Sequence, residues 1–127
     1  MEFSIPLFWK ELVERLEYEK PPVIIFLLGG VDTGKTFLCR YLLYEFQRRG
    51  RYVALLDTDP GQSIVGPPAT EGVFIPKRYA YINRDELPLL KPNYMTFVGS
   101  TSPVGHLLQC VVGARKLLDR TLYRGVE

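Results

Sequence analysis

The stretch that most constrains the fold is an apolar run, residues 23–28, followed at once by a glycine-rich turn. The turn reads Gly-Gly-Val-Asp-Thr-Gly-Lys-Thr over residues 29–36 and fits the pattern G-x-x-x-x-G-K-[ST]. Glycines let such a turn curl so that several backbone N–H groups point at one phosphate. The alternative is a strand-to-helix turn with an unrelated lysine, and the buried strand before and the helix after disfavour it. We therefore predict a phosphate-binding loop.

Residue types within this turn indicate their roles. Lys35 is expected to reach the β- and γ-phosphates, and the Thr36 hydroxyl is expected to ligate Mg²⁺. The helix that follows adds the positive end of its dipole. The predicted nucleotide contacts are Gly29, Gly30, Val31, Asp32, Thr33, Gly34, Lys35, Thr36 and Phe37.

The remainder of the chain is organised around this loop as one domain, residues 21–127, preceded by an amphipathic helix over residues 1–20. The apolar face of that helix comprises Phe8, Leu12, Val13 and Leu16, with Trp9 as an anchor. A helix packed on the domain surface is the simplest interpretation, and a partner-docking helix is the alternative. Pro21-Pro22 ends the helix and begins the first strand.

A strand, loop, helix and strand follow one another over residues 23–57, which predicts a βαβ unit with parallel strands. The helix covers residues 35–49, and Gly50 supplies its C-terminal cap. A third buried strand is predicted at residues 94–99, and residues 73–75 and 79–82 predict a hairpin or an insertion over the sheet. The helix over residues 104–122 presents apolar residues for burial: Leu107, Leu108, Val111, Val112, Leu117 and Leu118. The expected fold is three-layer α/β/α with a mainly parallel sheet.

Two acids, Asp57 and Asp59, leave the end of the second predicted strand. In an open parallel sheet, ligands bind at the carboxyl ends of the strands, so both acids should lie near the phosphate loop. Phosphoryl transfer needs a carboxylate to orient the attacking hydroxyl and groups that hold Mg²⁺. The alternative is an Asp-Pro-Gly turn in which the acids only cap backbone N–H groups. The upstream loop favours the catalytic interpretation.

Basic and aromatic residues alternate in residues 77–84. Such a pattern suits a single-stranded nucleic acid, although a solvated edge hairpin is the simpler interpretation. Hydroxyls at residues 100–102 follow the third predicted strand and should line the same crevice. His106 begins the next helix and is equally compatible with a capping role or a phosphate contact.

Three segments together resemble the polynucleotide 5′-hydroxyl kinases: GGVDTGKT, then LLDTDPGQSIVGPPAT, then FVGSTSPVGHLLQCVVGARKLL. That family includes archaeal RNA kinases and the kinase of the eukaryotic pre-mRNA cleavage machinery. The resemblance covers residues 22–118, and D-x-D-x-G-Q-S followed by G-P-P is its most restrictive part. It implies a P-loop NTPase fold, with ATP as phosphate donor and RNA or DNA 5′-hydroxyl ends as acceptor.

The resemblance also implies roles for individual residues. Lys35 and Thr36 would hold ATP and Mg²⁺, Asp59 would be the general base, and Asp57 would assist the metal through water. Substrate contacts are implied for Gln62, Ser63, Thr101, Ser102 and His106.

Family members continue beyond the stretch that this sequence matches, so we expect a domain incomplete at its C-terminus, with activity impaired by a missing arginine-bearing lid. Its exposed sheet edge would favour self-association or a partner. A regulatory P-loop ATPase or GTPase and a non-catalytic ATP-binding scaffold in an RNA-processing complex are the alternatives. Cys39 and Cys110 have no metal or disulfide spacing. With no signal peptide and no membrane span, the expected location is the cytoplasm.

Overall fold

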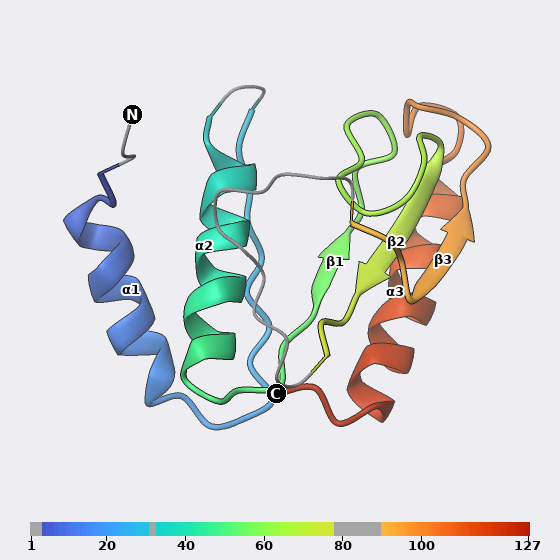
Figure 1. The fold of residues 1–127 in the computed structure, drawn as a ribbon. Helices are drawn as coiled ribbons and strands as arrows, with labels where there is room; N and C mark the ends of the chain where they lie inside the picture. Colours follow the sequence, from blue (N-terminus) through green and yellow to red (C-terminus); the bar gives the residue numbers. More distant parts are fainter. Residues whose placement is uncertain (1–3, 31–32, 78–89) are drawn as a thin grey trace.

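A computed structural model of the chain describes residues 4–30, 33–77 and 90–127. Its helices are α1 (Leu7–Glu17), α2 (Lys35–Arg48) and α3 (Leu107–Tyr123), and its strands are β1 (Leu55–Asp57), β2 (Thr70–Phe74) and β3 (Tyr94–Phe97). Figure 1 shows α3 against one face of the sheet, with α2 and then α1 beyond the extended residues 23–28 on the other side. The fold is therefore α/β, with helices on both sides of the extended segments.

The sheet differs from the prediction in the relative direction of its strands and in the segments that form it. Its order is β1-β2-β3, and both pairs are antiparallel, with Leu55 opposite Phe74 and Thr70 opposite Phe97. The predicted parallel sheet is not confirmed, because residues 23–28 are extended but join no strand of the described sheet. A strand at residues 73–74 is confirmed, but these residues belong to the central strand β2 of the sheet and not to a hairpin or insertion over it. The other arm of the predicted hairpin, residues 79–82, lies outside the described residues.

A glycine explains how β2 can return beside β1. The Cβ of an alanine at position 72 would lie 2.8 Å from the carbonyl oxygen of Val65. Because Gly72 has no side chain, the turn after β1 folds back directly over β2, and Val65 is fully buried there. The close return places an antiparallel strand next to β1.

The helix α1 packs on α2 through Trp9, as the sequence predicted. Trp9 and Val13 are buried, and the Trp9 ring lies 5.6 Å from the Tyr41 ring between centroids. Phe8 is 64% exposed, so its predicted place on the packed face is wrong. The side chain of Arg49, just past the end of α2, forms ion pairs with two glutamates of α1, and these pairs fasten the two helices together.

The apolar stripe predicted for α3 is largely wrong. Leu107, Leu108, Val111 and Val112 are exposed, and Leu118 is half-buried. The buried positions are instead Cys110, Gly113, Leu117 and Thr121. At position 113 an added Cβ would lie 2.5 Å from Glu71 Oε1 and 2.6 Å from Thr96 Oγ1. The helix therefore approaches β2 and β3 on its small-residue face, which turns the larger apolar residues outward.

Both cysteines are free thiols, Cys110 buried and Cys39 half-buried. None of the described helices combines the length and the apolar content that crossing a lipid bilayer would require.

Candidate nucleotide and acceptor site

The glycine turn, residues 29–36, joins residues 23–28 to α2. A Cβ at position 29 would lie 2.6 Å from Thr33 Oγ1 and 3.2 Å from the Cγ and Cδ atoms of Lys35. The lysine stem therefore folds back over Gly29, and a side chain at position 29 would force the side chains of Thr33 and Lys35 to shift. Gly34 has φ of 85° and caps α2, a backbone conformation that favours glycine. The Thr33 hydroxyl donates to the Gly30 carbonyl at 2.8 Å. Val31 and Asp32 lie outside the described residues.

The acidic turn, residues 57–66, is built around the carboxylate of Asp57. Asp57 Oδ1 accepts a hydrogen bond from the Asp59 N–H at 3.0 Å. Its Oδ2 accepts from the N–H groups of Ile64 at 2.6 Å and Val65 at 3.2 Å. Burial raises the pKa of Asp57, these backbone bonds oppose the rise, and the charge of Asp59 adds to it. Asp57 therefore holds the turn in shape, as the capping alternative proposed.

Asp59 is exposed and less completely engaged. Its Oδ1 accepts from the N–H groups of Gly61 at 3.0 Å and Gln62 at 3.2 Å, and its backbone carbonyl accepts from the Ser63 hydroxyl. No group in the described parts of the chain bonds to Asp59 Oδ2 in this structure. The second carboxylate oxygen of Asp59 is thus available to accept a proton or a cation.

The serine turn, residues 100–106, meets the acidic turn at Gly61. A Cβ on residue 61 would lie 2.8 Å from the carbonyl oxygen of Thr101. The Ser102 hydroxyl accepts from the Val104 N–H at 3.2 Å, and His106 Nδ1 lies 3.2 Å from the Val104 carbonyl. Ser102 and His106 thus engage their own turn, and the Thr101 carbonyl lies against the acidic turn at Gly61.

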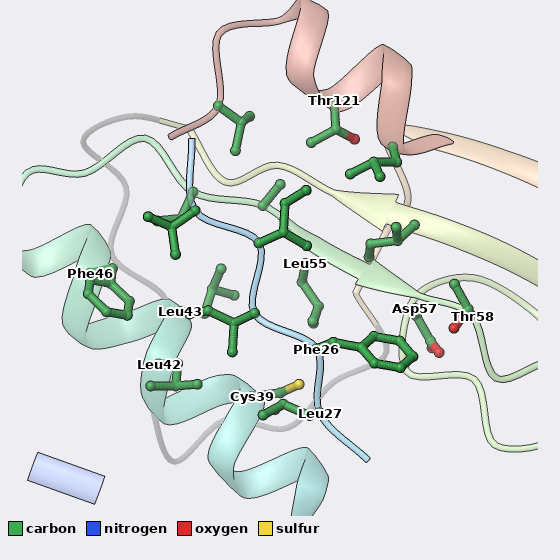
Figure 2. Close-up of a pocket in the computed structure, with 18 of the residues that line it drawn as sticks. Phe26, Leu27, Cys39, Leu42, Leu43, Phe46, Leu55, Asp57, Thr58 and Thr121 are labelled. Carbon is green, nitrogen blue, oxygen red and sulfur yellow. The ribbon is translucent and has the colours of Figure 1, made fainter. Parts of the chain in front are cut away.

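An apolar cavity of about 480 Å³ lies between the glycine turn and the acidic turn. Figure 2 shows its wall on α2 formed by Cys39, Leu42, Leu43 and Phe46, with Thr121 of α3 opposite. At its polar end Phe26 reaches from residues 23–28 toward Asp57 and Thr58 (Figure 2). The predicted site residues that line it are Lys35, Thr36, Asp57, Asp59 and Gln62. Ser63, Thr101, Ser102 and His106 are not among its lining residues.

Cys39 lies on the α2 wall of the cavity, near charges of both turns. Burial raises the pKa of Cys39 to about 11, the charge of Asp57 adds to the rise, and the charge of Lys35, four residues earlier on α2, opposes it. A thiol with a pKa raised in this way stays protonated at neutral pH and is a poor nucleophile.

A cation would have to be held here by few protein ligands. The described residues contain no group of three or more His, Cys, Asp or Glu side chains that could hold a metal. Thr36 and Asp57 line the same cavity, and both Asp57 oxygens already accept backbone N–H groups, so Asp57 would reach a cation through water. Mg²⁺ is commonly bound by one or two protein ligands together with water and phosphate oxygens, so these residues fit it.

Sequence reasoning missed Glu71, which lies at the back of the sheet. Its side chain is 1% exposed, and burial raises its pKa to about 7, with the charge of Asp57 adding to the rise and the Thr96 hydroxyl opposing it. A glutamate two residues before Val73 and Phe74 in a buried strand, Thr70–Phe74, was the available signal.

Comparison with known proteins identifies the family of the chain. The sequence matches the family described as the mRNA cleavage and polyadenylation factor CLP1 P-loop over residues 29–125. It is 37% identical over 109 residues to the polyribonucleotide 5′-hydroxyl kinase of Methanocaldococcus jannaschii, covering 86% of this chain and 29% of that protein. The kinase of the same name from Pyrococcus furiosus is 36% identical over 119 residues, with 94% and 32% covered.

The similarity extends to eukaryotic relatives. The polyribonucleotide 5′-hydroxyl kinase Clp1 of Xenopus tropicalis is 36% identical over 90 residues, which cover 68% of this chain and 19% of that protein. The chain thus spans about 29% of the length of the archaeal relative described first. The resemblance that the sequence motifs indicated is confirmed: the chain belongs to the CLP1 P-loop family, which has a P-loop NTPase fold.

Proposed function

We propose that the chain carries the nucleotide-binding and base-bearing part of an ATP-dependent polynucleotide 5′-hydroxyl kinase. The observation that carries the proposal is a single cavity lined by both Lys35 of the glycine turn and Asp59 of the acidic turn. The names of the archaeal relatives, polyribonucleotide 5′-hydroxyl kinases, support the same reaction. No observation favours the ATPase, GTPase or scaffold alternatives.

In the proposed reaction the 5′-hydroxyl oxygen of RNA or DNA attacks the γ-phosphorus of ATP. The bond from that phosphorus to the β–γ bridging oxygen breaks, ADP leaves, and the hydroxyl proton passes to Asp59 Oδ2. Lys35 and the backbone N–H groups of the glycine turn neutralise phosphate charge, which is the largest contribution that a protein makes to this chemistry. Mg²⁺ near Thr36 would supply further charge neutralisation when bound.

We assign different roles to the two carboxylates of the acidic turn. Three backbone N–H groups already bind Asp57, so its proposed contact with the metal is indirect, through water. Asp59 has one carboxylate oxygen tied to the turn and the other available, the arrangement a positioned general base requires. Gln62 lines the cavity beside it, and we assign the acceptor end to this side.

The contacts of Ser63, Thr101, Ser102 and His106 with substrate remain predictions. The first two adjoin the acidic turn, because Ser63 is part of it and Thr101 packs on Gly61. Ser102 and His106 bond within their own turn and would need to turn outward to contact a substrate. Of the basic and aromatic segment proposed to track a single strand, residues 77–84, all but Lys77 lie outside the described residues.

The test is single-turnover transfer of labelled γ-phosphate to a 5′-hydroxyl oligoribonucleotide and its DNA counterpart, with the protein in excess. Asp59→Asn should lower the rate by about 10²-fold or more while ATP binding persists, and Lys35→Ala should lower both. Asp119→Asn, an exposed carboxylate on α3, is the matched control. Label released as free phosphate would favour the ATPase alternative, and tight ATP retention without turnover would favour the scaffold. Equal transfer by wild type and Asp59→Asn would remove Asp59 from the base role.

A further inference from the structure

Glu71 of β2 is a buried acid that the proposed reaction does not use. Its side chain points to the face of the sheet that α3 covers, because Glu71 Oε1 lies 2.5 Å from where a Cβ on Gly113 would stand. Asp57 lies on the other face, where it binds the Val65 N–H and Val65 packs against Gly72. The sheet therefore separates the Glu71 side chain from the acidic turn.

The surroundings of Glu71 compensate its charge poorly. Glu71 Oε1 and Thr96 Oγ1, opposite each other on β2 and β3, are buried, and within the described chain neither has a hydrogen-bond partner. Glu71 also takes part in none of the ion pairs among the described residues. An ionised carboxylate in such a place costs free energy that a neutral carboxyl group does not.

Three elements bring titratable or polar groups toward Glu71. Burial raises the pKa of Glu71 to about 7, the charge of Asp57 on β1 adds to the rise, and the Thr96 hydroxyl on β3 opposes it. On α3, burial and then the charge of Glu71 raise the pKa of the Cys110 thiol. The charged residues of α3 beside Thr96 are exposed and lie along an outer groove: Lys116, Asp119 and Arg120.

The contact at Glu71 also bears on the candidate site. Figure 1 shows α3 running along β2 and β3, and it approaches them through the gap at Gly113 with Cys110 buried beside it. The serine turn leads directly into α3, and its Thr101 carbonyl lies against Gly61 of the acidic turn. A displacement of α3 would therefore be felt where the two turns meet.

We propose that protonation of Glu71 controls how closely α3 packs on the sheet. While the carboxyl group is neutral, the helix stays in contact with β2 and β3. When its O–H bond breaks, the proton passes to solvent water, and α3 withdraws far enough for water to reach the carboxylate. The serine turn then moves relative to Gly61, so the two turns separate as the pH rises through neutrality.

Cys110 provides a direct test, because it is buried on the face of α3 that meets the sheet. The rate of its alkylation is measured near pH 6 and near pH 8 in a chain carrying Cys39→Ala, relative to the urea-unfolded chain at the same pH. This ratio removes the ordinary effect of pH on thiols. We expect it to rise about fivefold or more from pH 6 to pH 8, and to stay constant when Glu71→Gln is added. The charge of Glu71 alone would lower the reactivity of the thiol, so a rise reports exposure.

Backbone NMR tests whether the serine turn moves with the helix. Histidines commonly titrate near neutral pH, so this chain carries His106→Gln. We expect the amides of Gly61 and of residues 100–105 to shift together, with one midpoint at the pKa of Glu71, about 7.

Two further variants locate the titrating group. Thr96→Val removes the hydroxyl that opposes the rise in the pKa of Glu71, so the midpoint should move to higher pH. Glu11→Gln, at an exposed position on α1, is the matched control and should leave the midpoint in place. No nucleotide or RNA is present, so these outcomes are independent of the proposed kinase reaction.

Four results would overturn the proposal. Equal relative reactivity of Cys110 at both pH values would show that α3 stays packed after Glu71 ionises. A rise that persists in Glu71→Gln would assign the change to another group. Loss of all dispersed resonances at pH 8 would show that the whole chain unfolds. If Glu71→Gln does not fold, Thr96→Val decides, and a midpoint that stays or falls contradicts the role of Glu71.

Discussion

The glycine turn and the acidic turn face each other across one cavity, yet they are built in opposite ways. The acidic turn is tied internally, because Asp57 and Asp59 together accept five backbone N–H bonds within residues 59–65. Among its described residues, the glycine turn has one side-chain hydrogen bond, from the Thr33 hydroxyl to the Gly30 carbonyl. A turn that satisfies its own N–H groups is a fixed support, whereas one that leaves them open is suited to an anionic ligand. The comparison predicts that substitutions in the first turn affect stability and those in the second affect binding.

The largest effect is expected at Lys35. Lys35→Ala removes the one cation whose stem lies over Gly29, and nucleotide affinity should fall about tenfold to a hundredfold because charge-assisted bonds to phosphate are lost. Titration with a fluorescent ATP analogue measures this, with Lys116→Ala on the exposed side of α3 as control. The free energy of unfolding should stay nearly unchanged. A large loss in the free energy of unfolding would contradict the inference that the glycine turn serves binding and not stability.

The next effect separates the two acids. Asp57→Asn places an NH₂ group among three backbone donors, so we expect a loss of about 2 kcal/mol in the free energy of unfolding. Asp59→Asn keeps one oxygen for Gly61 and Gln62 and should cost less than about 1 kcal/mol. Urea unfolding of both variants measures the difference. Equal losses would contradict the assignment of Asp57 as the support of the turn.

A glycine joins the acidic turn to its neighbour. In Gly61→Ala the new Cβ would lie 2.8 Å from the Thr101 carbonyl, which is backbone and cannot swing aside. We expect a loss of about 1–2 kcal/mol and shifted NMR resonances in residues 100–103. Gly125→Ala tests a glycine of φ 82° that has no neighbour within 4 Å, so it should strain its own backbone without disturbing those resonances.

The smallest effect concerns the sheet behind the acidic turn and depends on pH. The pKa of Glu71 in the folded chain, about 7, lies above its ordinary value of 4.5. The folded chain therefore binds this proton more tightly than the unfolded chain, so the contribution to stability is full below pH 4.5 and declines as the pH rises to 7. In Glu71→Gln that decline should disappear, so the variant should gain stability relative to wild type as the pH rises from 4.5 to 8. Parallel stability curves for the two proteins would show that Glu71 ionises normally.

Local patterns predicted the three helices better than the sheet. The G-x-x-x-x-G-K-[ST] pattern placed the start of α2 correctly because Gly34 and Lys35 determine a helix start through their own backbone. The family membership was also evident from residues 29–36 and 57–68. Strand pairing depends on contacts between distant residues, and the return of β2 over Gly72 has no local sequence signal. The parallel pairing was inferred from chain order alone, which does not fix which edges meet.

The sequence named the residues of a candidate site, and only some of those residues line the cavity. Lys35, Thr36, Asp57, Asp59 and Gln62 line one cavity, because strand ends and the helix start meet there. The sequence offered the capping role of Asp57 only as an alternative. That role depends on three backbone N–H groups of residues 59–65, which come close to the Asp57 carboxylate only in the folded turn. The face of α3 was missed because hydrophobicity favours the leucines, whereas the close approach at Gly113 favours small residues.

Gly113 has a consequence for the geometry of the serine turn. The helix α3 begins at Leu107, immediately after that turn, and rests on β2 and β3 through the space that Gly113 leaves. A larger residue at this position would push α3 away from β2 and β3. The serine turn precedes α3 directly, so it would move with the helix, and Thr101 would move away from Gly61. The missing side chain at Gly113 thus allows the close contact of α3 with β2 and β3 that positions the serine turn at the start of the helix.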